Sequence, residues 1–235
     1  APSNSVTPAT PTSQVASNGT GGTYTFLAHN LGADTSLDPH TPVVGLQGAY
    51  IQWGKRGPNT TGDSTLDWKT AANDGSSGFA AAPTASAAND AVISDWSQTT
   101  AADSSWNSDT EANPVKVTAN DPCPTGYRVP TRTEWAAVGD NNTVSRTGTF
   151  EVGTANYGSA LHYGSTTSLK LLTLPATGYR DSANGALSNR GSNGDYWSST
   201  ENGSNAFSVY FGSSSVDPAG NSNRTFGISV RCIAE

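Results

Sequence analysis

The two cysteines of the chain, Cys123 and Cys232, constrain its fold more than any other feature. They are the only cysteines among 235 residues and stand 109 positions apart, which excludes the closely spaced pair of a metal or redox motif. A structural disulfide is the natural interpretation. It would stabilise the fold by roughly 4–5 kcal/mol in the chain-entropy model and would require an oxidising compartment. Two separately buried thiols are the alternative.

The polarity of the chain comes from Ser, Thr, Asn and Gly rather than from charged residues. Hydrophobic residues make up 34% of the sequence and charged residues 13%, a composition typical of loops and β-structure with few amphipathic helices. The length permits one large domain or two small ones. The composition therefore predicts much loop and β-structure with few helices.

Charge and hydropathy argue against two classes of partner. The net charge is −7 and no basic stripe is present, so we expect no binding to the phosphate backbone of a nucleic acid. No apolar run approaches the roughly 20 residues that span a bilayer, so we expect no membrane span. No charged region followed by an apolar stretch begins the chain, and we expect any export signal to have been removed.

Residues 1–22 are rich in Pro, Ser, Thr, Asn and Gly and lack apolar periodicity, which is typical of a disordered leader or linker. We therefore predict one domain over residues 23–235, opening with strands at 24–31 and 48–53. From about residue 54 to 117, polar residues and glycines interrupt every candidate element. We expect the large rings of three tryptophans to pin these loops onto the core: Trp68, Trp96 and Trp106. An insertion of little function is the alternative.

The segment 130–138 carries the clearest helix signal. Thr131 and Glu134 have the spacing of a capping box, in which each side chain binds the other's free backbone amide. Trp135 and Val138 then lie on the same face of the predicted helix. We expect the helix to end near Gly139, because glycine readily adopts the left-handed conformation that ends helices.

The C-terminal part of the chain has the pattern of short strands. Residues 169–174 form an apolar run, and 176–180 continue it in a strand-like segment. Within 207–211, the odd-numbered residues are apolar and alternate with small or polar ones, which is the period of a half-buried strand. Residues 227–233 show the same alternation of apolar with small or polar residues.

The sequence contains no motif of a common enzyme class, with neither a nucleophile elbow, nor a zinc-protease helix, nor a phosphate-binding loop. The histidines His29, His40 and His162 are scattered, and His29 has the setting of a hydrogen-bonded structural residue. Residues 181–185 resemble a calcium loop but lack its closing ligands, and their Asn-Gly pair favours a turn. We predict no enzymatic activity, no metal and no cofactor.

Several motifs occur in the order seen in one family of bacterial surface proteins. Residues 121–135 (DPCPTGYRVPTRTEW) resemble the Fibrobacter succinogenes major paralogous domain family. Residues 194–199 (GDYWSS) and 224–232 (RTFGISVRC) resemble its closing motifs. Residues 26–32 and 50–54 resemble its opening, so the likeness spans the predicted domain.

That family is similar to the C-type-lectin-like fold of formylglycine-generating enzymes. Its C-terminal motif is shared with the variable proteins of diversity-generating retroelements, in which mutagenesis at template adenines turns asparagine codons into many residue types. The resemblance implies an α+β, C-type-lectin-like fold that is irregular and loop-rich, with short antiparallel strands and about two helices. It also implies a ligand-binding protein with a variable region at about 194–232.

The local chemistry of this region agrees with that implication. Apolar residues alternate there with Ser, Asn, Asp, Gly, Tyr and Thr, and a solvent-facing substitution usually changes stability by no more than about 0.5 kcal/mol. Tyrosine and serine also suit adaptable recognition surfaces. An ordinary polar surface is the alternative. The residues that we predict to bind ligand are Asn202, Ser204, Asn205, Ser208, Tyr210, Gly212, Ser215, Asp217, Gly220, Ser222 and Phe226.

Other residues of the same motifs hold the backbone in a rigid frame. We assign this structural role to Cys123, Cys232, Trp197, Arg224 and Arg231. Phe226 is the ligand-binding candidate that could instead belong to the core. We expect Arg224 to pair with a carboxylate or with loop carbonyls, because a guanidinium binds both strongly.

Two departures limit what the resemblance carries over. Formylglycine-generating enzymes use a cysteine pair in the active site, and this chain has no local second cysteine, so we do not expect that activity. Sugar-binding C-type lectins hold calcium with Glu-Pro-Asn or Gln-Pro-Asp and with Trp-Asn-Asp, and these triplets are absent. This absence argues against calcium-dependent sugar binding.

We therefore expect an extracellular adhesin or receptor-binding protein, on a cell surface or a phage tail, whose C-terminal face binds a protein or glycan. A non-variable structural surface lipoprotein or pilus component is one alternative. An enzyme of the formylglycine-generating-enzyme-like fold is another, and a deep pocket with convergent titratable residues would favour it.

Overall fold

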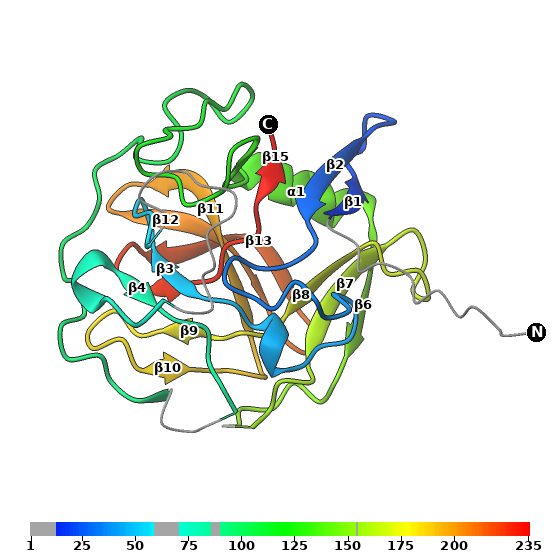
Figure 1. The fold of residues 1–235 in the computed structure, drawn as a ribbon. Coiled ribbons are helices and arrows are strands. Elements are labelled where there is room, and N and C mark those ends of the chain that lie inside the picture. The colour runs from blue at the N-terminus through cyan, green and yellow to red at the C-terminus, as the bar shows by residue number, and fades with distance from the viewer. Residues whose placement is uncertain (1–12, 59–70, 86–89, 154) are drawn as a thin grey trace, which may run out of the picture.

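Short antiparallel strands make up most of the regular structure in the computed structural model, which describes residues 13–58, 71–85, 90–153 and 155–235 (Figure 1). Two larger sheets join segments that are far apart in the chain. The first consists, in spatial order, of β1 (Ser13–Ser17), β2 (Thr23–Leu27), β15 (Ile233–Ala234) and β5 (Tyr127–Arg128). The second consists of β10 (Leu187–Ser188), β9 (Tyr179–Arg180), β14 (Gly227–Ile228), β3 (Tyr50–Gln52) and β4 (Phe79–Ala80).

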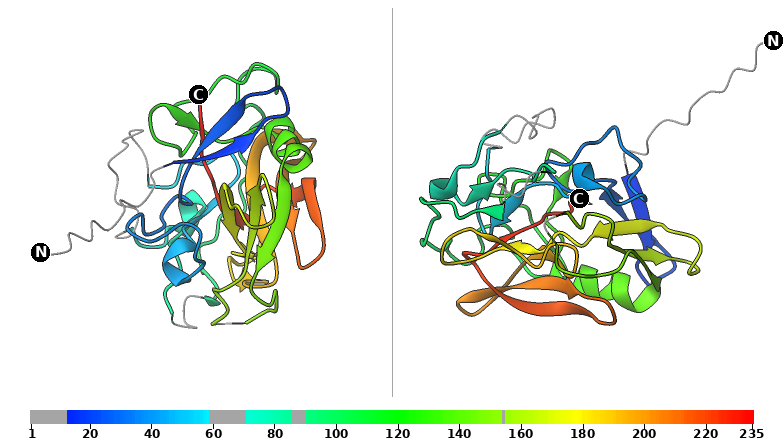
Figure 2. Two further views of the ribbon diagram at one scale, coloured as in Figure 1. Left: turned by 90° about the vertical axis from the view of Figure 1, so that its right-hand side faces the viewer. Right: turned by 90° about the horizontal axis from the view of Figure 1, so that it is seen from below.

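Two smaller sheets are built from consecutive strands. One contains β6 (Thr143–Thr147), β7 (Ala160–Gly164) and β8 (Leu172–Pro175). The other contains β11 (Gly194–Asn202), β12 (Asn205–Phe211) and β13 (Val216–Asn223). In the view from below, β11–β13 and the helix α1 lie side by side along one edge of the molecule (Figure 2).

The predicted α+β class is confirmed, with fewer helices than expected. Among the residues that the structure describes, α1 (Arg132–Asn141) is the one α-helix, where we expected about two. Single 3₁₀ turns, η1 (Val44–Leu46) and η3 (Gly75–Ser77), occur elsewhere. The glycines and small polar residues of the long loops account for the shortfall, because they favour turns over helices.

The capping box of α1 is confirmed, but the helix does not end at Gly139. Thr131 accepts a hydrogen bond from the amide of Glu134, and the Glu134 side chain accepts one from the amide of Thr131. The helix continues to Asn141. Its last carbonyls are bound by side chains instead of by a glycine turn, since Asn142 Nδ2 donates to Val138 O across 2.9 Å. This replaces the left-handed glycine cap that we expected.

Part of the predicted leader is a strand of the folded domain. Residues 13–17 form β1, which pairs with β2 and buries Gln14 and Ala16. This part of the prediction is wrong, because β1 is ordered by its pairing with β2 and by the contacts of Gln14 with Thr173 and Arg231, none of which depends on apolar periodicity. Residues 1–12 lie outside the described residues.

The loops between residues 54 and 117 are fixed to the core by tryptophan side chains, as expected. Trp96 is buried and its Nε1 donates to Thr225 O across 2.9 Å. Trp106 is buried too, and its ring centroid lies 5.5 Å from that of Trp53. The third tryptophan of the prediction, Trp68, lies outside the described residues.

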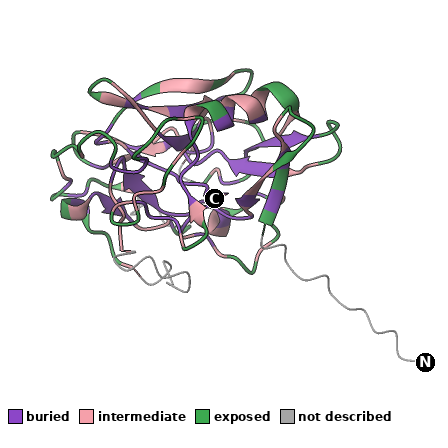
Figure 3. Cartoon of the chain, turned by 90° about the horizontal axis from the view of Figure 1, so that it is seen from above, coloured by how far each residue is buried: buried purple, intermediate pink, exposed green. Residues whose placement is uncertain are grey.

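The sheet of β11–β13 separates two hydrophobic clusters. Trp197 and Ala206 belong to one cluster, which also contains the cysteines. Tyr196, Val209 and Phe211 belong to the other, into which α1 places Trp135. Seen from above, buried segments gather at the centre of the molecule and exposed loops surround them (Figure 3). The C-terminal sheet is therefore part of the core on both sides.

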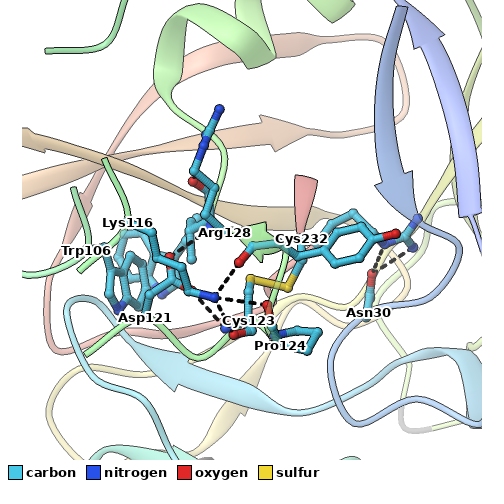
Figure 4. The surroundings of a disulfide bond; sticks show 12 residues. Asn30, Trp106, Lys116, Asp121, Cys123, Pro124, Arg128 and Cys232 are labelled. Carbon is cyan, nitrogen blue, oxygen red and sulfur yellow. Dashed lines mark hydrogen bonds between the residues drawn. A yellow bond between two sulfur atoms is a disulfide. The ribbon is translucent and has the colours of Figure 1, made fainter. Parts of the chain in front are cut away.

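The disulfide between Cys123 and Cys232 is present and fully buried, which confirms the prediction (Figure 4). Beside it, Lys116 Nζ donates to Cys123 O across 2.8 Å and to two further backbone carbonyls. Asp121 accepts hydrogen bonds from the amides of Cys123 and Val129. The bridge thus ties an irregular but tightly hydrogen-bonded loop to the end of the chain.

Candidate ligand-binding surface

The strands β11, β12 and β13 form an antiparallel meander with two exposed turns. The β11–β12 turn (residues 203–204) and the β12–β13 turn (residues 212–215) lie at opposite ends of β12. Seven residues of β-strand separate them, a distance of roughly 23 Å at about 3.3 Å per residue. The predicted ligand-binding residues therefore extend along the sheet from one turn to the other, and Phe226 follows the last strand of the sheet.

Arg224, a residue that we assigned to the frame, binds the β11–β12 turn through its backbone. Its Nη2 donates to Gly203 O across 2.7 Å and its Nε donates to Asn205 O across 3.0 Å. The guanidinium also pairs with Asp103 and stacks 4.4 Å from the Trp53 ring centroid. Arg224 thus contacts both kinds of partner that we expected, a carboxylate and loop carbonyls.

Arg146 binds the β12–β13 turn through its backbone in the same way. From β6, its Nε donates to Gly212 O across 2.8 Å and its Nη2 donates to Ser215 O across 3.1 Å. Sequence analysis missed this residue, because nothing local in the sequence links β6 to a turn about 66 positions later. Both turns are therefore fixed through main-chain carbonyls, a contact that does not depend on the side chains that the turns carry.

The expected alternation in β12 holds only in part. Val209 and Phe211 are buried as predicted, but Phe207 is half-buried, while Ala206 and Ser208 are buried instead. Both faces of the sheet are packed, because Ala206 belongs to the hydrophobic cluster that contains Trp197, whereas Val209 and Phe211 belong to the other cluster. A β-bulge also interrupts the pairing: between Ser208 and Tyr210 the partner on β13 moves by three residues, not two. Phe207 lies beneath the guanidinium of Arg132, 4.9 Å from its ring centroid.

The predicted ligand-binding residues differ in exposure. Those that are exposed are Ser204, Ser215 and Asp217; those that are half-buried are Asn202, Asn205, Tyr210, Gly220 and Phe226; and those that are buried are Ser208, Gly212 and Ser222. The two buried serines face each other, with 2.9 Å between their Oγ atoms. They belong to the interior of the sheet, so the prediction is corrected for this pair.

The two glycines among the predicted ligand-binding residues, Gly212 and Gly220, differ in the space available for a side chain. A Cβ at Gly212 would meet no atom closer than 3.7 Å, so a side chain can be added there although the backbone is buried. A Cβ at Gly220 would lie 3.1 Å from Ser208 O and 3.2 Å from Tyr210 Cβ. Gly220 is therefore a crowded position, and Gly212 is an open one.

The frame residues Trp197 and Arg231 are fully buried. Trp197 Nε1 donates to Ile51 O across 2.6 Å, which joins β11 to β3. Arg231 donates to Asn30 Oδ1, Gln14 Oε1 and Thr173 O at 2.8–3.0 Å. All three acceptors are uncharged, and burial lowers the pKa of the Arg231 guanidinium to about 10.

A buried carboxylate lies at the same end of the sheet as the β12–β13 turn. Asp195 on β11 is 6% exposed, and its Oδ2 has no hydrogen-bond partner. Burial raises the pKa of Asp195 to about 7, because a low-dielectric environment disfavours the charged form. Sequence analysis did not single out this residue, since an Asp within a strand motif carries no local signal of burial.

The histidines are separate from this surface. His29 contacts Leu37 O across 2.9 Å, in keeping with a structural role. His40 and His162 both contact the hydroxyl of Thr173, at 2.7 and 2.8 Å. Within the described ranges, no group of three or more His, Cys, Asp or Glu side chains could hold a metal ion. Residues 181–185 form a tight turn, closed by a hydrogen bond from Gly185 N to Asp181 O across 2.9 Å.

Comparison with known families identifies the C-terminal half of the chain. A family model described as Fibrobacter succinogenes major domain matches residues 113–234, just over half of the 235 residues. The chain belongs to this family. The Fibrobacter succinogenes major domain of this chain contains the disulfide, α1 and the whole β11–β13 sheet. The motifs at 26–32 and 50–54 lie outside the match. No curated protein and no solved structure matches the chain.

In the part of the chain that the structure describes, no helix has the length and apolar character needed to cross a membrane.

Proposed function

We propose that this chain is an extracellular ligand-binding protein, an adhesin or receptor-binding protein, whose recognition surface tolerates many sequences. The surface comprises the β11–β12 turn, the β12–β13 turn and the outer strand β13. The observation that carries the proposal is that Arg224 and Arg146 bind these turns through backbone carbonyls. The side chains of the turns are then free to change without loss of the turn conformation.

The exposure of the turns supports the proposal. Ser204, Ser215 and Asp217 are exposed, and a Cβ at Gly212 would make only ordinary van der Waals contacts, the nearest at 3.7 Å. Substitution at solvent-facing positions usually changes stability by no more than about 0.5 kcal/mol. Gly203, with a φ of 60°, is the position that the turn itself restricts, because L-residues rarely adopt positive φ.

The rigidity of the support is the second argument. A recognition surface gains affinity when its loops are ordered before binding, since less conformational entropy is lost. The sheet has buried residues on both sides, and the disulfide ties the end of the chain to the loop at Cys123. The disulfide also supports an oxidising, extracellular setting.

The C-type-lectin-like scaffold and diversification by a retroelement are part of the same proposal, and both rest on the resemblance of the motifs. Sequencing the flanking DNA tests the second. We expect a near-identical template with adenines at the codons of the exposed turn residues, next to a reverse transcriptase gene. Without such a template, the surface would be constant within a cell lineage.

The binding function is tested by an array of surface glycans and surface proteins. The wild type is compared with a variant that carries Ser204→Tyr, Ser215→Tyr and Asp217→Lys, at equal melting temperature. We expect the wild type to bind members of the array and the variant to bind a different set or none. Identical binding by the two proteins would contradict the proposal, as would an absence of binding by both. A matched control carries the same types of change at Ser104, Ser108 and Asp140, which are exposed elsewhere.

A further inference from the structure

A row of side chains crosses three strands next to the β12–β13 turn. An isolated parallel bridge pairs Gly178 with Gly194, which places Tyr179 beside Asp195 in the next position. On the other side, Asp195 pairs with Tyr210 across β11 and β12. Paired residues of neighbouring strands direct their side chains to the same face of a sheet. The carboxylate of Asp195 is thus flanked by two tyrosines.

A third ring and an amide complete the surroundings. The ring of Phe226 packs against Tyr179 with 5.0 Å between centroids. Asn193 Nδ2 donates to the hydroxyl of Tyr210 across 3.1 Å, which fixes the position of that ring. Each of the three rings is half-buried. The Asp195 cluster, defined as Tyr179, Asp195, Tyr210 and Phe226, therefore lies between the core and solvent.

The carboxylate in this cluster has no counter-charge. Its Oδ2 lacks a hydrogen-bond partner, and no cationic side chain contributes to its altered pKa, for which burial alone accounts. A buried carboxylate without a cation or a donor is unfavourable. The other buried charged groups of the described residues have hydrogen-bond partners, for example Arg128 with Glu134 and Asp121 with two backbone amides. Asp195 differs from these groups, because its buried Oδ2 has no hydrogen-bond partner.

Aromatic rings around a carboxylate suit one class of ligand. The faces of tyrosine and phenylalanine attract cations, and a carboxylate forms a strong charge-assisted hydrogen bond with an ammonium group. Asp217, which pairs with Tyr210 on β13, adds a further negative charge at the exposed edge. The net charge of −7 favours a cationic partner in the same sense.

We propose that the Asp195 cluster binds an organic ammonium group, such as a lysine side chain on the surface of a partner protein. This inference rests on the proposed ligand-binding function and assigns the chemistry of one end of the surface. The ammonium would donate to Asp195 and lie against the rings of Tyr179, Tyr210 and Phe226.

The pH dependence of binding follows from the groups that face Asp195. In the described part of the chain these are Tyr179 from β9 and Tyr210 from β12, with Asp217 at the edge of β13, and no Lys or Arg of that part is among them. Because the free carboxyl has a raised pKa, part of it is protonated near neutral pH. An ammonium ligand favours the ionised form, so binding releases protons and weakens as the pH falls below 7.

The test is a titration of the full chain with Nα-acetyl-lysine methylamide, followed by amide and carboxyl chemical shifts. We expect shifts at residues 178–180, 194–196, 209–211 and 226, with affinity that falls about tenfold between pH 8 and pH 6. The same compound acetylated at Nε has no charge and serves as the matched ligand control. Equal binding of the acetylated compound, or no shifts at these residues, would overturn the proposal.

The matched protein variants are Asp195→Asn and Asp140→Asn. Both remove one carboxyl, but Asp140 is exposed on α1. We expect Asp195→Asn to weaken lysine binding at least tenfold and to remove its pH dependence, and Asp140→Asn to leave both unchanged. The melting temperature shows whether Asp195→Asn folds. If it does not fold, Tyr210→Ala replaces it, and undiminished lysine binding by the variant that folds would refute the site.

The two proposals fail separately. If the protein binds members of the surface array but not the lysine amide, the ammonium site is wrong and the recognition surface stands. If the lysine amide binds while the turn substitutions have no effect on the array, the recognition surface is wrong and the ammonium site stands.

Discussion

Arg231 Nη1 donates a hydrogen bond to Gln14 Oε1 across 3.0 Å, so a residue near the end of the chain is bound to one near its beginning. The Gln14 oxygen also accepts from the amide of Thr173 on β8. A fully buried guanidinium has to donate its hydrogens to acceptors in the protein, because no water replaces them. Together with the pairing of β1 with β2, this contact accounts for the order of residues 13–17 in a segment that has the composition of a linker.

We predict that Gln14→Ala destabilises the fold by about 1–3 kcal/mol, the usual effect of leaving a buried donor without a partner. For a chain of this size, that corresponds to a fall in melting temperature of roughly 2–4 °C for each kcal/mol. Ser13→Ala is the control, because Ser13 is exposed on the same strand. Equal melting temperatures for the two variants would show that the Arg231 contact contributes nothing.

We predict that the two turns depend on their arginines and not on their own side chains. Arg224→Ala should lower stability by roughly 2–4 kcal/mol, because Gly203 O and Asn205 O lose their donor and the cation–π contact with Trp53 is lost. Arg146→Ala should have a smaller effect, since Arg146 is only half-buried. Ser204→Tyr and Ser215→Tyr should each change stability by no more than about 0.5 kcal/mol. Denaturant unfolding of the four variants measures the difference.

We predict that the double variant Cys123→Ala/Cys232→Ala is less stable than the wild type by roughly 4 kcal/mol, the estimate for a long closed loop. Replacing both cysteines leaves no free thiol in the core cluster that contains them. Alkylation of the wild type without reductant should modify neither cysteine. Two freely alkylated thiols in the native protein would contradict the buried bridge.

We predict that His162 makes the fold less stable in acid. Burial lowers the pKa of His162 to about 4, while an unfolded histidine titrates near 6.5. Between about pH 4 and pH 6.5 the unfolded chain therefore binds more protons than the native chain, and stability falls as the pH is lowered through this range. His162→Gln should lose this dependence.

The measurement is the difference in melting temperature between His162→Gln and the wild type. Relative to the wild type, the melting temperature of the variant should be higher at pH 5 than it is at pH 7.5. The comparison cancels the opposite contribution of Asp195, whose raised pKa makes stability fall as the pH rises between about 4 and 7. A difference that does not change with pH would show that His162 is not held neutral by the fold.

Features that depend on neighbouring residues could be read from the sequence. The start of α1 is set by Thr131 and Glu134, three positions apart, and each completes the hydrogen bonds of the other. The turn at 181–185 is likewise set by its own glycine and aspartate. The disulfide could be predicted because the chain has only two cysteines.

The tertiary structure alone decided which side chains meet. Ser208 is buried although the alternation predicted it to be exposed, because the sheet packs against a hydrophobic cluster on each face. The same holds for Arg146 at the β12–β13 turn and for Asp195 between two tyrosines, because their partners come from distant parts of the chain. Sequence patterns report local hydrogen bonds and periodic burial, whereas these contacts arise only when separate strands pack together.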